Sequence, residues 1–153
     1  MSSFGAIAQT AINLTYEKDY HQWTIEQAQA LRELVNTHQE LKHFEKLDWD
    51  NIIEEIEALG RSEYNAVVSL LLRQIEHCLK IDYVSLPECR NKWKSEVIAF
   101  KVGINRKFAP SMKPKLEKQF EGIYKDAVRI VEAEYEISLP KQCPYSLDDL
   151  LSS

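Results

Sequence analysis

The chain has 153 residues, of which 44% are hydrophobic and 28% are charged, and its formal net charge is −5 at pH 7. This length predicts one domain, and the composition excludes an intrinsically disordered chain. The acidic balance argues weakly against a dedicated binder of polyanions, and three widely spaced cysteines without a Cys-x-x-Cys motif indicate neither a disulfide framework nor a zinc knuckle.

The start of the chain lacks the features of a targeting segment. No Lys or Arg precedes Lys18, and a signal peptide needs a basic start. No apolar run approaches the roughly 18 residues of a membrane span. We therefore expect a cytoplasmic protein that does not act at a membrane, with an irregular leader over residues 1–15 and a single helical domain over residues 16–153.

Helical spacing of apolar residues dominates the chain after this leader. The spacing predicts a first helix from Tyr20 to Val35, with Asp19 or Thr24 as its N-cap. Residues 38–47 are predicted to be a connector with one helical turn at most.

The next two predicted helices meet at a glycine. Asp48 is the predicted N-cap of the second helix, and apolar residues then recur at helical spacing. Gly60 and Ser62 mark either the end of this helix or a kink, so its continuity with the third helix stays open. The third helix, over about residues 61–82, is apolar around much of its circumference. This pattern predicts a place in the middle of a bundle.

Prolines and capping residues delimit the rest of the chain. A fourth helix is predicted over about residues 91–108, and Pro110 ends it. Ser111 can cap a fifth helix, and Ser146 with Asp149 resembles the capping box of a short last helix. The sequence therefore predicts an all-α, single-domain bundle of five to six helices. The residues central to each apolar stripe should be buried: Trp49, Ile56, Leu71, Ile75, Leu79, Trp93, Phe100, Phe120 and Tyr124.

Short motifs follow one another in a characteristic order. They are Tyr16, Asp19 and Trp23, then Leu47-Asp48-Trp49 before Glu54-Glu55-Ile56-Glu57-Ala58-Leu59-Gly60-Arg61-Ser62, then His77-Cys78-Leu79-Lys80, Trp93, Pro110-Ser111-Met112 and Cys143-Pro144-Tyr145. Over about residues 16–151 this order resembles the bacterial family called domain of unknown function 29. Cys78 departs from the family pattern, where leucine is expected, but exchanges one apolar residue for another. The resemblance implies a single helical domain and assigns no activity.

Carboxylates gather on the second predicted helix. Asp50, Glu54 and Glu57 share one narrow face, while Glu55 points elsewhere. Like charges at this spacing cost a few tenths of a kcal/mol per pair, so a cation should compensate them. We predict that at least two of these carboxylates pair with Arg or Lys side chains, and Arg61 is the nearest donor. A solvated acidic face is the alternative.

The compensating charge is also present later in the chain. Between Glu88 and Lys118, nine Lys and Arg residues stand against three Glu residues, a balance of +6. Arg106 belongs to this basic 90–118 segment, which is a second source of donors for the acidic helix. Its aromatic residues could instead stack on nucleic-acid bases.

The signs of catalysis are weak. Carboxylate-bridged two-metal bundles need Glu-x-x-His on two helices, and this chain has the motif once, at Glu40–His43. We therefore expect no metal and no cofactor. His77, with Glu76 and Lys80 nearby, could act as a general base, although a histidine at the edge of an apolar face more often packs there with one hydrogen bond.

These observations favour a non-enzymatic protein-interaction or regulatory module that acts with a protein partner or as a homo-oligomer. A nucleic-acid-binding protein that uses the basic 90–118 segment is the second interpretation, and a metal- or His-dependent enzyme is the third. The candidate functional and ion-pair surface consists of Asp50, Glu54, Glu55, Glu57, Arg61, His77, Lys80 and Arg106.

Overall fold

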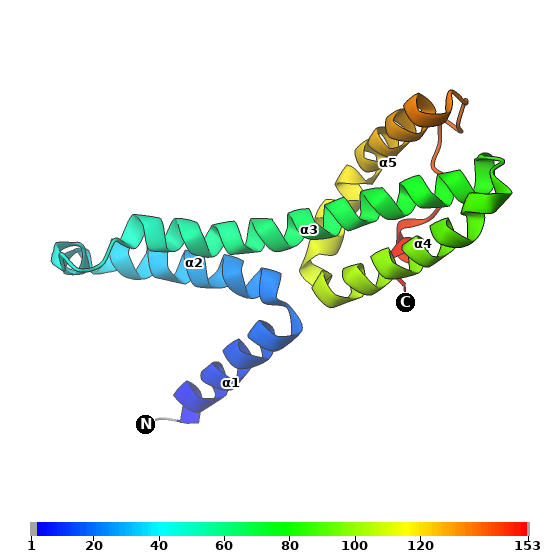
Figure 1. Cartoon of the computed structure of the whole chain (residues 1–153). Coiled ribbons are helices and arrows are strands. Elements are labelled where there is room, and N and C mark those ends of the chain that lie inside the picture. The colour runs from blue at the N-terminus through cyan, green and yellow to red at the C-terminus, as the bar shows by residue number, and fades with distance from the viewer. Residues whose placement is uncertain (1–2, 153) are drawn as a thin grey trace. The chain divides into compact units, whose positions relative to one another are not determined.

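The computed structural model describes residues 3–152, and this part of the chain is built from helices without strands (Figure 1). The α-helices are α1 (Ser3–Lys18), α2 (Tyr20–Thr37), α3 (Trp49–Tyr83), α4 (Pro87–Lys107), α5 (Lys113–Tyr135) and α6 (Leu147–Leu151). Two short 3-10 helices, η1 (Gln39–His43) and η2 (Pro110–Met112), lie in the connections. The all-α prediction is confirmed.

The irregular leader predicted for residues 1–15 is wrong from Ser3 onward, because α1 occupies Ser3–Lys18. Residues 1 and 2 lie outside the described part of the chain. The segment has no proline, a single glycine and several alanines, and alanine has the highest helix propensity. No acidic residue lies in the first turn of α1, so this signal of a helix start is absent there.

The chain divides into two compact units, which are described separately below. The first unit contains Met1–Tyr64 and Ala109–Met112, and the second contains Asn65–Phe108 and Lys113–Ser153. Helix α3 contributes its first half to the first unit and its second half to the second. The single domain over residues 16–153 stays a prediction. None of the described helices combines the length and apolarity that a membrane crossing requires.

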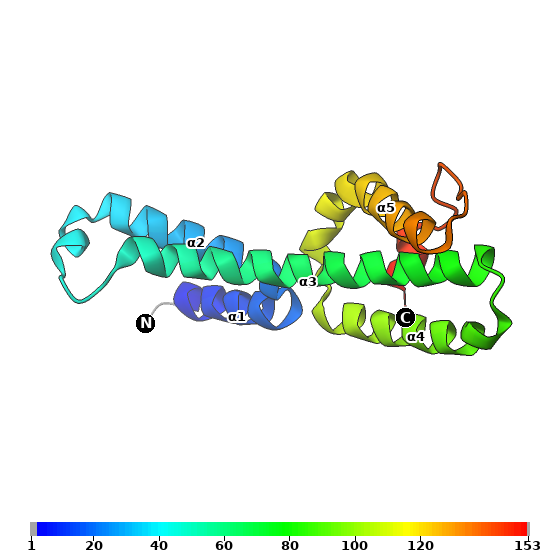
Figure 2. The same cartoon turned by 45° about the horizontal axis from the view of Figure 1, so that its top comes forward.

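In the first unit, α2 and the first half of α3 lie side by side in both views and are joined through η1 (Figures 1 and 2). Asp19 is the N-cap of α2, since its carboxylate accepts a hydrogen bond from the Gln22 amide at 2.9 Å. Thr24, the alternative cap, is instead fully buried within α2. Its hydroxyl donates to the His21 carbonyl at 2.7 Å.

Helix α3 runs without interruption through Gly60, so the predicted second and third helices are one helix of 35 residues (Figure 2). A Cβ atom at Gly60 would lie 2.3 Å from the Thr24 hydroxyl oxygen. Glycine therefore stands at position 60 because α2 and α3 approach closely there. It neither ends nor kinks the helix. Asp48 caps α3 as predicted, accepting from the Asn51 amide at 3.3 Å.

In the second unit, α4 returns alongside the second half of α3 (Figure 2), and α5 runs at an angle to α3 (Figure 1). Helix α4 begins at Pro87, earlier than predicted, because proline suits the first position of a helix. Ser146 caps α6 as predicted, accepting from the Asp149 amide at 3.1 Å.

The predicted core divides into two groups. Leu71, Ile75, Leu79, Trp93 and Tyr124, all in the second unit, are buried. The other predicted core residues are half-buried: Trp49, Ile56, Phe100 and Phe120. The buried members of the predicted core therefore all lie in the second unit.

Candidate functional site

Two arginines of the first unit compensate the carboxylate face of α3. One nitrogen of Arg61 lies 2.6 Å from Glu54 Oε1, and the other lies 4.0 Å from Glu57 Oε2. Glu57 also forms an ion pair with Arg32 of α2. Two of the four carboxylates thus pair with arginine, as predicted. The sequence identified Arg61 but missed Arg32, because periodicity does not tell which residues of α2 face α3.

The remaining acidic candidates are open to solvent. Asp50 lies in the first turn of α3, where a negative charge suits the helix dipole, and both it and Glu55 are exposed. Pairing of these carboxylates with the basic 90–118 segment stays a prediction, since most of that segment belongs to the second unit.

His77 lies on α3 in the second unit and has a side chain only 13% exposed. Its Nε2 atom is 2.6 Å from Glu96 Oε2, and its Nδ1 atom is 2.8 Å from the Arg73 carbonyl oxygen. Phe100 packs edge-on against the ring at 5.0 Å. Both ring nitrogens face acceptors, so both hydrogen bonds form only when each nitrogen carries a proton. Both ring nitrogens are thus engaged within the protein, and a role of His77 as a general base stays a prediction.

Lys80, one turn after His77, holds its ammonium group among a carboxylate and two aromatic rings. Its side chain is 11% exposed, and its Nζ atom lies 3.4 Å from Glu134 Oε2. The same atom lies 5.9 Å from the ring centroid of Trp93 and 5.8 Å from that of Tyr135. These distances permit cation–π attraction with both rings. Lys80 thereby links α3 to α4 and α5.

Glu76, which directly precedes His77 in the sequence, adds a carboxylate to this part of α3. Burial raises the pKa of Glu76 above its ordinary value, and the nearby charges of Lys80, His77 and Arg73 offset only part of this effect. A raised pKa means that the folded protein disfavours the ionised form. The raised pKa of Glu76 contributes to the stability of the folded protein at low pH. This contribution is lost as the pH rises through the pKa of Glu76 in the folded state.

We call His77, Lys80, Glu96 and Glu134 the ion-pair cluster of the second unit. The sequence identified His77 and Lys80 as candidates but missed both glutamates. No local signal marks Glu96 or Glu134, because each lies on a different helix and meets its partner through the tertiary fold alone. The cluster can hold three helices in register through paired charges.

Cys78 and Cys143 of the second unit are poor nucleophiles. Burial, helped by the charge of Asp82, raises the pKa of Cys78 to about 11, and burial also raises the pKa of Cys143. At neutral pH these thiols are protonated, and the thiolate is the reactive form. Nearby, the Tyr145 hydroxyl donates to Asp82 Oδ2 at 2.7 Å.

Within residues 3–152, no three His, Cys, Asp or Glu side chains gather in a group that could hold a metal ion. The single Glu-x-x-His motif, Glu40–His43, lies on η1, and both of its end residues are exposed. Arg106 is exposed in the last turn of α4, where a cation suits the helix dipole.

The aromatic residues of the basic 90–118 segment pack inward. Trp93 is buried, and Phe100 and Phe108 are half-buried. Lys113 pairs with Asp148 at 2.8 Å. These rings are therefore used in packing and do not form an open platform for base stacking.

An aromatic cluster at the junction of α1 and α2 was not identified as a site from the sequence. Tyr16 contacts Trp23 with ring centroids 4.9 Å apart, and Tyr20 lies 5.6 Å from Tyr16 and 5.8 Å from Trp23. Tyr16 is 51% exposed and Ile12, one turn earlier on α1, is 39% exposed. We call Ile12, Tyr16, Tyr20 and Trp23 the aromatic patch. Tyr16 and Trp23 already stood in the sequence motif with Asp19.

Asp19 ties this junction to η2 of the same unit. Its Oδ2 atom accepts from the Ser111 amide at 2.9 Å, and its Oδ1 atom accepts from the Ser111 hydroxyl at 2.7 Å. His21 Nδ1 lies 3.0 Å from the same hydroxyl. In a nucleophilic triad the histidine stands between serine and carboxylate. Here the serine stands in the middle, so the three residues form a structural tie.

Comparisons with known proteins agree with this fold. The family model described as Domain of unknown function DUF29 matches residues 15–153. A search of the curated proteins gives no match. The chain is similar to a solved structure from Rhodospirillum rubrum described as an alpha-helical protein of unknown function, with 28% identity and a TM-score of 0.77, covering 90% of this chain and 89% of that one.

Proposed function

The chain belongs to the family described as Domain of unknown function DUF29, and within that family we propose that it is a non-enzymatic interaction or regulatory module that binds a protein through the aromatic patch. The observation that carries this proposal is the half-exposed cluster of two tyrosines and a tryptophan at the α1–α2 junction. Tyr and Trp are the residues most enriched among the energetic centres of protein interfaces. A cytoplasmic location stays a prediction.

The patch meets two further requirements of a binding surface. Its rings contact one another, and Asp19 fixes the start of α2 to η2, so little side-chain freedom remains to be lost on binding. Ile12 extends it with apolar area on α1. By contrast, the titratable residues of the ion-pair cluster of the second unit are engaged with each other.

The test places a photo-crosslinking phenylalanine analogue at position 16 of the full chain in cells, with the same analogue at position 98 as control. Ile98 is the matched site because it is also apolar and, at 63%, even more exposed. We expect a discrete crosslinked product from position 16 and none from position 98. A product of twice the chain mass would identify a second copy as the partner.

A second arm measures the effect of Tyr16→Ser on that complex. Interface truncations at such residues typically weaken binding by about 2 kcal/mol or more, which is a thirtyfold loss of affinity or greater. Ile98→Ser should leave the affinity unchanged. Equal crosslinking at both positions, or none at position 16, would contradict the proposal.

A further inference from the structure

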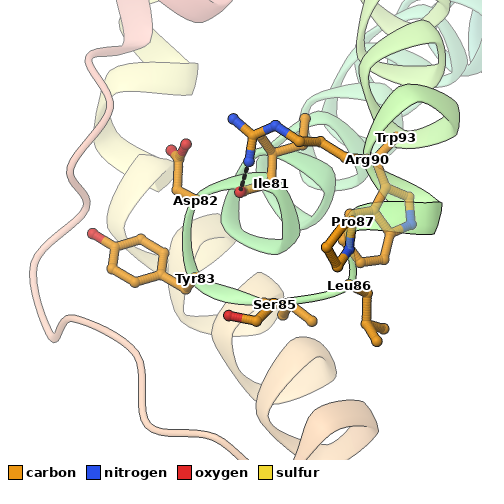
Figure 3. Close-up of a pocket in the computed structure, with 9 residues that line it drawn as sticks. Ile81, Asp82, Tyr83, Ser85, Leu86, Pro87, Arg90 and Trp93 are labelled. Carbon is orange, nitrogen blue, oxygen red and sulfur yellow. Dashed lines mark hydrogen bonds between the residues drawn. The ribbon is translucent and has the colours of Figure 1, made fainter.

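A cavity of about 300 Å³ lies in the second unit where α3 ends and α4 begins (Figure 3). Residues 81–87, Arg90 and Trp93 line it. This volume stands at the lower end of the range for small-molecule sites, roughly 300–1,000 Å³. The cavity therefore has room for a small organic molecule or for the terminal residue of a peptide.

The wall of the cavity is divided between apolar and polar side chains. Leu86, Pro87 and Trp93 contribute apolar surface (Figure 3). Trp93 is buried, since it also lies beside Lys80 and Tyr135. Packing against these two residues holds the Trp93 ring in place without a ligand.

Arg90 is the basic side chain in the wall of the cavity. Its Nη1 atom donates to the Ile81 carbonyl oxygen at 3.0 Å, which holds the guanidinium over the last turn of α3 (Figure 3). That bond uses one of the five N–H donors of the guanidinium. The remaining donors form the planar fork that binds a carboxylate through two parallel hydrogen bonds.

Asp82 is the acidic side chain in the cavity wall. Its Oδ2 atom accepts the hydrogen bond of the Tyr145 hydroxyl at 2.7 Å, so this carboxylate already has a partner within the protein. Arg90 has no such carboxylate partner among its described contacts. The side chain left to engage a charged ligand is therefore the cationic one.

We propose that this cavity binds a ligand with a carboxylate on a small apolar body. The carboxylate pairs with Arg90, and the apolar body lies against Trp93 and Pro87. The carboxylate belongs either to a free small acid or to the C-terminus of a peptide, two sources of one chemistry. The site is independent of the aromatic patch, because it lies in the other unit.

The experiment titrates the full chain, labelled with ¹⁵N, with hexanoate and with hexylamine, which share an apolar body and differ in charge. We expect saturable shifts of the Trp93 indole signal and of the amides of residues 81–90 with hexanoate alone. A leucine-terminated tripeptide with a free C-terminus, compared with its C-terminal amide, distinguishes the sources. Tighter binding of the free peptide than of hexanoate indicates a peptide ligand, and the reverse indicates a free acid.

Arg90→Gln tests whether Arg90 pairs with the carboxylate of the ligand. Removing a charged partner should raise the Kd for hexanoate at least about tenfold. Arg106→Gln removes an exposed cation from the same helix and should leave the Kd unchanged. Circular dichroism should show the same fold for both variants, since both residues are exposed. Equal affinity for hexylamine, an unchanged Kd in Arg90→Gln, or no saturable shift with either acid would overturn the proposal.

Discussion

The two units differ in the size of the side chains that they bury. Of the eleven largest fully buried side chains among those described, nine belong to the second unit, including Leu71, Ile75 and Leu79. In the first unit, small side chains occupy the contact of α2 with α3, where Thr24 and Ala28 are buried and Gly60 stands opposite Thr24.

Exposed apolar side chains show the opposite distribution between the two units. Nine of the thirteen exposed large hydrophobic side chains described lie in the first unit. Burial of apolar area is the main source of stability, at about 25 cal/mol per Å². The comparison therefore assigns stability chiefly to the second unit and the proposed recognition of a protein partner to the first. Each of the following predictions tests one side of this comparison.

Truncation of the second unit's core should have the largest effect. Leu71 is fully buried, and Leu71→Ala should lower the free energy of unfolding by about 2–5 kcal/mol because it leaves a cavity. Leu59→Ala is the control on the same helix: Leu59 is 48% exposed in the first unit. Its effect should stay within about 0.5 kcal/mol in a urea titration. Equal losses of stability in the two variants would contradict the difference between the two units.

Asp19→Ala should have the next largest effect, because it removes the cap of α2 and both hydrogen bonds to Ser111 together. Loss of a cap and of charge-assisted hydrogen bonds should cost about 1–3 kcal/mol. Ser111→Ala removes only the hydroxyl and should cost less. The two costs should not add in the double variant, measured by thermal unfolding, since they share one network. Additive losses of stability would contradict a shared hydrogen-bond network of Asp19 and Ser111 at the junction.

Gly60→Ala tests the close contact of the first unit. The new methyl group would meet the Thr24 hydroxyl, and overpacking costs about 1–3 kcal/mol, while alanine regains up to about 1 kcal/mol of helix propensity. We expect a net loss of stability. Gly122→Ala, which adds a methyl group with no described atom within 4 Å, should raise stability by up to about 1 kcal/mol.

Thr24→Ala, combined with Gly60→Ala, tests whether contact with the Thr24 hydroxyl causes the loss of stability. It removes the hydroxyl oxygen that the new Cβ atom would meet, so the double variant should recover part of the stability that Gly60→Ala loses. If Gly60→Ala instead raises stability as Gly122→Ala does, then close approach is not the reason for the glycine.

Charge reversal on the acidic face should have the smallest effect. Glu54→Lys breaks the pair with Arg61, in which both side chains are more than half exposed, so the loss should be about 0–1 kcal/mol. Arg61→Glu in the same chain should restore part of that loss, measured by thermal unfolding at low salt. Absence of any recovery would show that Glu54 and Arg61 do not interact in solution.

The sequence predicted the features that depend on local chemistry. Asp19, Asp48 and Ser146 were identified as caps because a side-chain oxygen next to an apolar run satisfies free amide groups. The apolar stripe of α3 likewise identified its buried core. Helix α1 was missed because no acidic residue in its first turn marks its start.

The sequence could not predict the features that depend on which helix faces which. Gly60 has the same local signal whether it ends a helix or allows Thr24 of another helix to approach. His77 and Lys80 were identified by residue type, but their partners Glu96 and Glu134 lie on α4 and α5. Arg32 was missed for the same reason. Such pairings are determined by tertiary packing, which a single sequence does not encode in any local pattern.

Native-state hydrogen exchange on the full chain tests most directly whether stability resides in the second unit. We expect the amides of α3 beyond Asn65, around Leu71 and Ile75, to exchange only through global unfolding, with the highest opening free energies in the molecule. The amides of α1 and the start of α2 should open at lower free energy. If the amides of α2 prove as strongly protected as those around Leu71, the two units share one core, and the division of stability and recognition is wrong.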